Sequence, residues 1–110
     1  MKKLAFTPDA NSVGHIENAS DYVDSVVLAA SVAKSFAKPT GARFVRLSSS
    51  VQFEYSTSGA AAVIAVADIT NGSSSVSSPV NVRPFFCIDD VISVSVVAAS
   101  ACVVTAEFWG

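Results

Sequence analysis

The last twenty residues of the chain carry the same two-residue pattern twice. Apolar residues take every second position from Ile92 to Val96 and again from Cys102 to Phe108, with an Ala-Ala-Ser link between the two runs. A period of two places successive side chains on opposite faces of a β-strand. The intervening positions hold mostly small residues. We therefore predict a C-terminal hairpin whose second face can pack against another sheet or another subunit.

Further segments upstream have strand length and alternation. Residues 42–48 and 51–56 form a β-hairpin candidate, and the apolar run 60–67 predicts a strand buried on both faces. Two more strands are expected over 31–37 and 80–88. Short strands separated by turns are typical of a single antiparallel β-sandwich or a jelly-roll-like barrel, and we predict that all-β fold.

Turn signals separate these segments. Pro39-Thr40-Gly41 and Asp89-Asp90 are expected to be tight turns, because Gly adopts left-handed backbone conformations and Asp bonds its own backbone. Residues 68–79 read as a Ser-rich loop with its bend at Asn71-Gly72.

The first thirty residues differ in composition from the rest. Met1–Phe6 has the length of a short strand, whereas Thr7–Asp24 is rich in Asn, Asp and Ser without a sustained period. Long segments of this kind are often functional. We predict an extended N-terminal arm over residues 1–30 and a β-sandwich domain over 31–110.

The balance of charged and apolar residues points to assembly. Charged residues make up 15% of the chain and apolar residues 51%, with a mean hydropathy of +0.50. Oligomer interfaces are more apolar than ordinary surface, so we expect a dimer or trimer; alternatively, Ala and Val raise the hydropathy with no interface involved. The net charge of −2 argues against nucleic acid as a partner, and no apolar run reaches the roughly 20 residues of a membrane-spanning helix. We expect a soluble protein made in the cytoplasm.

The residues that usually carry chemistry are sparse. His15 is the single histidine and lies in the polar arm, without a nucleophile elbow elsewhere. Cys87 and Cys102 do not form a metal-binding motif, and we expect two free, buried thiols rather than a disulfide. The sequence therefore predicts no enzyme activity, no metal site, no cofactor and no small-molecule substrate.

Four residues are candidates for contacts with another subunit or a larger assembly. Arg43 and Arg46 lie three residues apart in one predicted strand and therefore on opposite faces, so one of them must point inward or into a contact. Such an Arg pairs either with an internal carboxylate such as Glu54 or with a neighbouring subunit. Phe108 and Trp109 belong to the C-terminal aromatic group, where ordinary core packing is the alternative to an interface.

The order of three motifs adds a resemblance. The stretch A-K-P-T-G-A-R-F-V-R-L-S-S, the later D-I-T-N-G-S-S-S and the ending A-A-S-A-C-V-V-T-A-E-F-W together resemble small structural proteins of tailed-phage heads. The resemblance covers about residues 36–109. It implies a capsid cement or decoration protein, located in the virion, that binds the outer surface of the shell and contacts itself and the major capsid protein. The alternative is a receptor- or glycan-binding head module of a phage fibre or tail.

Overall fold

The described chain is all-β and folds as an antiparallel β-sandwich. The computed structural model describes residues 1–8, 15–72, 76–78 and 83–110. The strands are β1 (Phe6–Pro8), β2 (His15–Glu17), β3 (Tyr22–Leu28), β4 (Lys34–Ala37), β5 (Phe44–Ser49), β6 (Phe53–Ser56), β7 (Val76–Ser78), β8 (Phe85–Cys87), β9 (Ser93–Val97) and β10 (Cys102–Trp109). These described strands confirm the predicted sandwich and do not close into a barrel.

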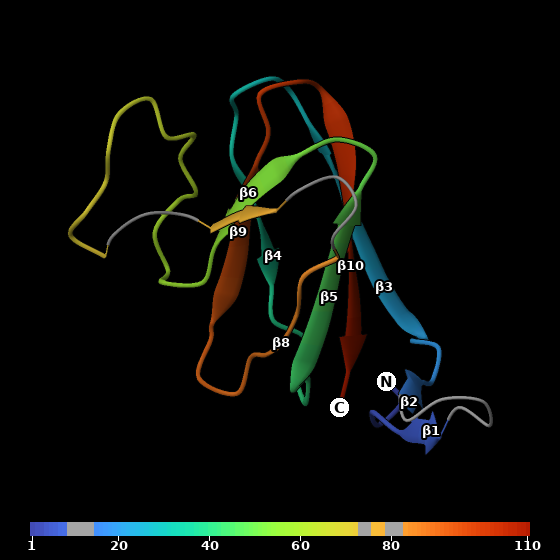
Figure 1. Ribbon diagram of the computed structural model, residues 1–110. Coiled ribbons are helices and arrows are strands. Elements are labelled where there is room, and N and C mark those ends of the chain that lie inside the picture. Colours follow the sequence, from blue (N-terminus) through green and yellow to red (C-terminus); the bar gives the residue numbers. More distant parts are fainter. Residues whose placement is uncertain (9–14, 73–75, 79–82) are drawn as a thin grey trace.

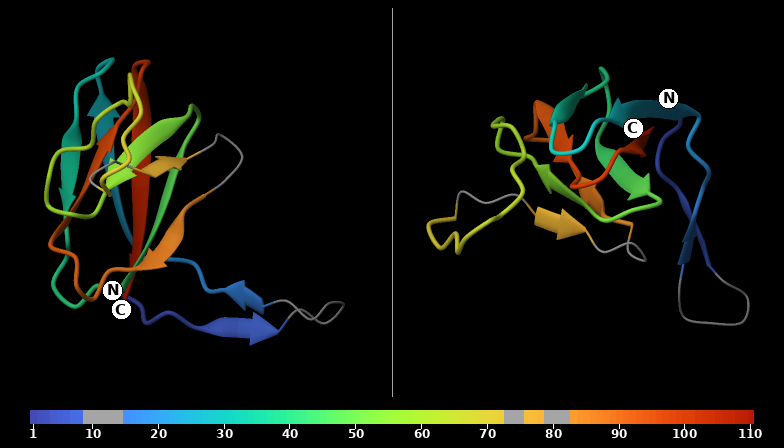
Figure 2. Two further views of the ribbon diagram at one scale, coloured as in Figure 1. Left: turned by 60° about the vertical axis from the view of Figure 1, so that its left-hand side comes forward. Right: turned by 90° about the horizontal axis from the view of Figure 1, so that it is seen from above.

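Two four-stranded sheets face each other, and a third, two-stranded ribbon lies outside them (Figure 1). The first sheet has the order β3-β10-β5-β8 and the second the order β4-β9-β6-β7, with every neighbouring pair antiparallel. In the first sheet Val104 of β10 lies between Val26 of β3 and Ser49 of β5. The ribbon of β1 and β2 projects from one end of the sandwich (Figure 2). It is the part of the predicted arm that lies outside the two sheets, and the name arm is used for it below.

Neither predicted hairpin forms, although each predicted strand within them does. β5 belongs to the first sheet and β6 to the second, and the same division separates β9 from β10. The chain therefore crosses from one sheet to the other between each pair. Both strands of a pair have an apolar face, and those faces meet across the core of the sandwich as readily as they align side by side.

The apolar run 60–67 is not a strand, which corrects the prediction. It forms a loop over the outer face of the second sheet, where Ala62 is buried and its backbone N–H donates a 2.8 Å hydrogen bond to Oγ of Ser95. Val66 in the same run is 95% exposed. The small residues suit close packing on β9, which is a role that apolarity alone does not distinguish from a strand.

β3 is the largest addition to the predicted strands. Tyr22–Leu28 falls within the segment expected to be the arm, yet all seven residues pair with β10. β4 begins at Lys34 rather than at residue 31, because Ser31 has a left-handed φ of 61° that interrupts the extended backbone. The first short strand lies at Phe6–Pro8 instead of at the start of the chain.

The local turn predictions hold. Gly41 has a φ of 86°, and the backbone N–H of Ala42 donates to the carbonyl of Pro39 at 3.0 Å. Asp89-Asp90 turns the chain after β8, and Asn71-Gly72 lies at a bend. Within the predicted Ser-rich loop, 76–78 forms β7, while 73–75 and 79 lie outside the described residues. Of the predicted strand 80–88, residues 85–87 form β8, and 80–82 also lie outside them.

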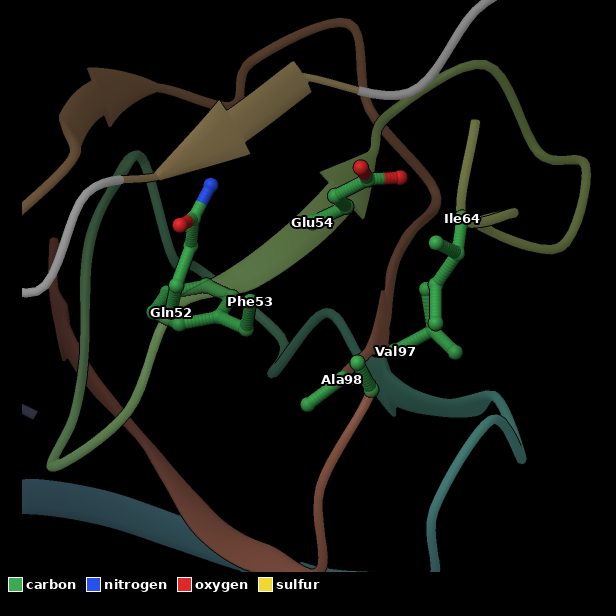
Figure 3. Close-up of a pocket in the computed structure, with 7 residues that line it drawn as sticks. Gln52, Phe53, Glu54, Ile64, Val97 and Ala98 are labelled. Carbon is green, nitrogen blue, oxygen red and sulfur yellow. The ribbon is translucent and has the colours of Figure 1, made fainter. Parts of the chain in front are cut away.

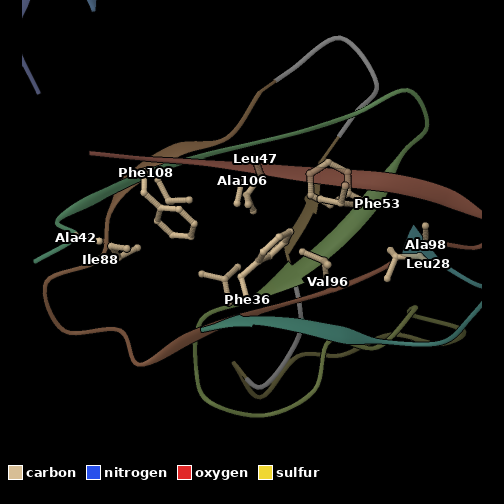
Figure 4. Packing of buried hydrophobic residues seen from close by; sticks show 13 residues of the cluster. Leu28, Phe36, Ala42, Leu47, Phe53, Ile88, Val96, Ala98, Ala106 and Phe108 are labelled. Atoms are coloured by element: carbon tan, nitrogen blue, oxygen red, sulfur yellow. The ribbon is translucent and has the colours of Figure 1, made fainter. Parts of the chain in front are cut away.

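The core lies between the two sheets. Phe36 from the second sheet and Phe108 from the first point into it, with Phe53 filling the space farther along (Figure 4). Inward residues of β10 alternate as the sequence predicts, since Val104, Ala106 and Phe108 are all buried. The ring of Tyr55 stacks on that of Phe86 at 5.2 Å and joins the two sheets.

Candidate interaction site at the root of the arm

Trp109 is fully buried although it points away from the core. Its neighbour Phe108 faces inward, so alternation places the indole on the outer face of the first sheet. There it is 0% exposed. The centroid of the Phe85 ring lies 5.4 Å from that of the indole, and Cζ of Arg46 lies 5.3 Å from the indole centroid. The indole Nε1 donates a 3.0 Å hydrogen bond to the carbonyl of Asn18. Trp109 therefore joins the sandwich to the root of the arm, just after β2.

Asn18 holds the two strands of the arm together where they leave the sandwich. Its Oδ1 accepts from the backbone N–H of Ala5 at 2.9 Å, and its Nδ2 donates to the carbonyl of Lys3 at 3.0 Å. Its own backbone N–H donates to the carbonyl of Ala5 at 2.9 Å. Because Asn18 supplies a donor and an acceptor at once, one side chain fixes both segments.

The N-terminal segment also pairs with the end of the chain. Leu4 N–H donates to the carbonyl of Gly110 at 3.0 Å, and Gly110 N–H donates to the carbonyl of Lys2 at 2.8 Å. The backbone N–H of Lys2 donates to Oδ1 of Asp21 at 2.7 Å. That hydrogen bond is the main cause of a lowered pKa of the Asp21 carboxyl. The root of the arm is thus fixed to the C-terminal end of β10 and to the residue before β3.

Arg46 links the arm to the sandwich by charge. Its Nε and Nη2 donate to the two carboxylate oxygens of Glu107 at 3.3 and 3.1 Å, and its Nη1 donates to Glu17 of the arm. The side chain is 18% exposed. The hydrogen bonds to Glu107 raise the pKa of Arg46 against the opposing effect of burial. A planar guanidinium that stacks on Trp109 can serve both carboxylates at once.

Arg43 makes a separate, exposed ion pair. It precedes β5 and donates from Nε and Nη2 to the two carboxylate oxygens of Asp89, both at 3.0 Å. The two side chains are 59% and 48% exposed. The hydrogen bonds from Arg43 are the main cause of a lowered pKa of Asp89, and a hydrogen bond with Cys87 adds to it.

The structure brings together two of the four predicted contact residues. Arg46 and Trp109 lie against each other, whereas Arg43 lies at the Asp89 turn and Phe108 in the core. Phe108 and Trp109 are 0% exposed, so neither offers surface to a second molecule in this conformation. Glu54 lies on β6 in the other sheet, and the carboxylates on the two arginines are Asp89, Glu107 and Glu17.

Sequence reasoning missed Glu17 and Asn18, which complete this site. Both lie in the polar segment that shows no strand period, so the only available signal is the density of Asn, Asp and Ser around them. Beyond them the arm carries Ile16, which is 58% exposed, and the exposed ring of Phe6. His15 belongs to β2 by its backbone, and its side chain lies outside the described part of the structure.

The two thiols are free but not both buried. Cys87 is exposed beside Asp89, and Cys102 is half-buried at the start of β10. The predicted free state therefore holds, while the predicted burial is wrong for Cys87 and only partial for Cys102. Cys87 lies opposite Phe44 on the outer face of the first sheet, so its thiol points away from the core.

A shallow hollow of about 220 Å³ lies on the second sheet under the 60–67 loop. Ile64 points toward Val97 at its floor, and Gln52 and Glu54 lie on the other side (Figure 3). Its lining is mainly apolar, and it lies at the opposite sheet from the Arg46 and Trp109 contacts.

These features define an antiparallel β-sandwich with a hairpin arm clamped at its root. Comparison with protein-family models, curated proteins and solved structures finds no match for the chain. Among the described residues, no three His, Cys, Asp or Glu side chains gather where a metal ion would bind. The described part of the chain also contains no helix long and apolar enough to cross a membrane.

Proposed function

We propose that this protein is a structural virion protein that binds the outer surface of a phage capsid and stabilises it as a cement or decoration protein. Its partners in this proposal are the major capsid protein and further copies of itself. The observation that carries the proposal is the arm, which is fixed firmly at its root and exposes apolar side chains beyond it.

A two-stranded hairpin gains little stability on its own in water. This ribbon projects from the sandwich (Figure 2), and its residues Phe6 and Ile16 are more than half exposed. Asn18 and Arg46 nevertheless hold its base in one position. A fixed base reduces the entropy lost on binding, so an arm of this design is suited to contact a neighbouring molecule.

The remaining surface agrees with a binding role. Exposed apolar residues occur on the sandwich as well as on the arm, and Val27 of β3 and Val103 of β10 lie opposite each other. Large exposed apolar areas on a soluble domain mark interaction sites. The resemblance to small head proteins of tailed phages, which rests on the motifs around Arg43 and Arg46 and at the C-terminus, supplies the identity of the partner.

The test is binding to capsids that lack the protein. The purified full chain is mixed with such shells, and bound protein is measured by co-sedimentation and located by electron microscopy. We expect regular density on the outer surface at capsomer junctions. Replacing Ile16→Ser on the arm is expected to reduce occupancy at least about tenfold, because the change removes an apolar contact.

Ile92→Ser is the matched control, since Ile92 is an exposed isoleucine of the sandwich away from the arm. It is expected to leave occupancy unchanged. Equal binding by the two variants contradicts the role of the arm. Density on the tail or its fibres, with none on the shell, contradicts the cement role and favours a receptor- or glycan-binding module.

A further inference from the structure

β3 is an uncovered edge of the first sheet. It pairs with β10 on one side, and among the described residues no strand pairs with its other side. Figure 1 shows it at the border of the sandwich, directly after the arm. All seven of its residues have consecutive partners on β10, from Tyr22 opposite Phe108 to Leu28 opposite Cys102. The strand is thus regular and without a bulge.

The other three edges are protected in ways that β3 is not. β7 and β8 have three residues each, and Pro84 directly precedes β8. β4 has four residues and carries an exposed Lys34. Short strands, lysine and proline are the usual means by which proteins prevent edge-to-edge pairing. β3 is longer than these strands and contains no Lys, Pro or Gly, and its charged residue is the single Asp24.

The outer face beside this edge is apolar. Val23 and Val27 of β3 are exposed there, and Val103 of β10 lies opposite Val27. Between them Ser25 and Thr105 join their hydroxyls at 3.1 Å. The nearest charge on this face, Glu107 opposite Val23, is neutralised by Arg46. On this outer face a second strand would add to the apolar area and meet no unpaired charge, because Asp24, the charged residue of β3, lies on the opposite face with Val26 and Leu28.

We propose that β3 pairs antiparallel with β3 of a second copy, about a two-fold axis at Ser25, so that the first sheets of the two copies become one continuous sheet. Ser25 is the midpoint of β3, so this register uses all seven residues. It places Val23 of one copy opposite Val27 of the other on the outer face. A twofold interface of this kind uses one surface twice.

Charge selects this register over its neighbour. Centring the axis on Asp24 would set two carboxylates directly opposite each other, which destabilises a strand pair. Centring it on Ser25 sets Asp24 opposite Val26 instead. The central strand β10 cannot provide such pairing, because β3 and β5 occupy both of its edges.

This pairing does not depend on what larger structure the protein binds. It is measured on the purified full chain without capsids, so its failure is separate from failure of the proposed function. Sedimentation analysis is expected to give a dimer for the natural protein. Ser25→Lys puts two lysines side by side at the axis and is expected to raise the dimer dissociation constant at least about tenfold.

Ser35→Lys is the matched control, because Ser35 is an exposed serine on β4, the edge of the other sheet. It is expected to leave the dimer intact, with the melting temperature of each variant recorded. The proposal is overturned if the natural protein stays monomeric at its highest soluble concentration. That is also the result expected if β3 receives a strand of another protein instead of a second copy. Equal loss of the dimer in both variants also overturns it.

Disulfide trapping tests the register without weakening the dimer. In a Cys87→Ser background, Ser25→Cys is expected to form a covalent dimer on oxidation, because directly opposite residues have Cβ atoms about 4.5–5.5 Å apart. A mixture of Val23→Cys and Val27→Cys is expected to cross-link to each other, and neither alone. Ser35→Cys is the control. Cross-linking of Ser25→Cys no greater than that of Ser35→Cys overturns the proposed pairing.

Discussion

The indole Nε1 of Trp109 and the backbone carbonyl of Asn18 are joined by a 3.0 Å hydrogen bond across 91 residues of sequence. It connects the last residue of β10 with the residue that clamps the arm. A buried indole N–H without an acceptor would be costly, so the arm and the indole stabilise each other's position. The position of the arm therefore depends on the end of the chain.

Replacing Asn18→Ala is expected to free the arm while leaving the sandwich folded. The change removes two side-chain hydrogen bonds at a half-buried position, so the free energy of unfolding should fall by about 1 kcal/mol. Trp109 is the chain's only tryptophan, so its emission should shift to longer wavelength as water reaches the indole. Thr57→Ala is the control, because Thr57 is exposed and directly follows β6 of the second sheet. An unchanged emission spectrum in Asn18→Ala contradicts the clamp.

The two arginines are expected to differ in their contribution to stability. Arg46→Ala leaves Glu107 and Glu17 without their partner in a half-buried site, so the free energy of unfolding should fall by about 1–3 kcal/mol. Arg46→Lys keeps the charge but loses the fork geometry of the guanidinium. Its free energy of unfolding should lie between those of the natural protein and of Arg46→Ala. Arg43→Ala removes an exposed pair with Asp89, so its melting temperature should fall by clearly less than that of Arg46→Ala. A larger loss for Arg43→Ala than for Arg46→Ala would show that burial does not decide the difference.

Asp89 is expected to make a small contribution to stability that acid removes. Arg43 lowers the pKa of its carboxyl below the ordinary value of 3.8, so its contribution is complete above that value. The contribution is lost as the pH falls through the lowered pKa of the folded protein. Thermal unfolding of the natural protein and of Asp89→Asn should therefore converge at low pH. Asp90→Asn is the control, because it removes the same charge from the adjacent residue. If its melting temperature differs from that of the natural protein with the same pH dependence as Asp89→Asn, the assignment to Asp89 is refuted.

The two thiols are expected to react at different rates in the folded protein. Cys87 is exposed, whereas Cys102 is half-buried against the core. A thiol reagent should modify one cysteine rapidly and the second more slowly, and Cys87→Ser should abolish the fast phase. Reductant should leave the melting temperature unchanged, because both thiols are free. Slow modification of both cysteines is the result that would count against this placement of Cys87.

Much of the candidate site was beyond reach of the sequence. Arg46 and Trp109 stand out as a charged and an aromatic residue in strand contexts, and the structure brings them together. Their partners Glu17 and Asn18 lie in a segment without period, so nothing local connects them to β10. Such contacts arise only when the root of the arm packs against the outer face of the first sheet.

The sequence by itself determined the all-β class, the inward positions of β10 and the turns at Gly41 and Asp89. These depend on local backbone preferences and on a two-residue period, which neighbouring residues specify. The tertiary structure decided which strands pair: β5 and β6 lie in different sheets, as do β9 and β10. Alternation is the same in a hairpin and at a sandwich corner, so only packing across the core distinguishes them. The same non-local packing decided that Trp109 is covered by the arm, that residues 60–67 form a loop over β9, and that β3 is left as an open edge.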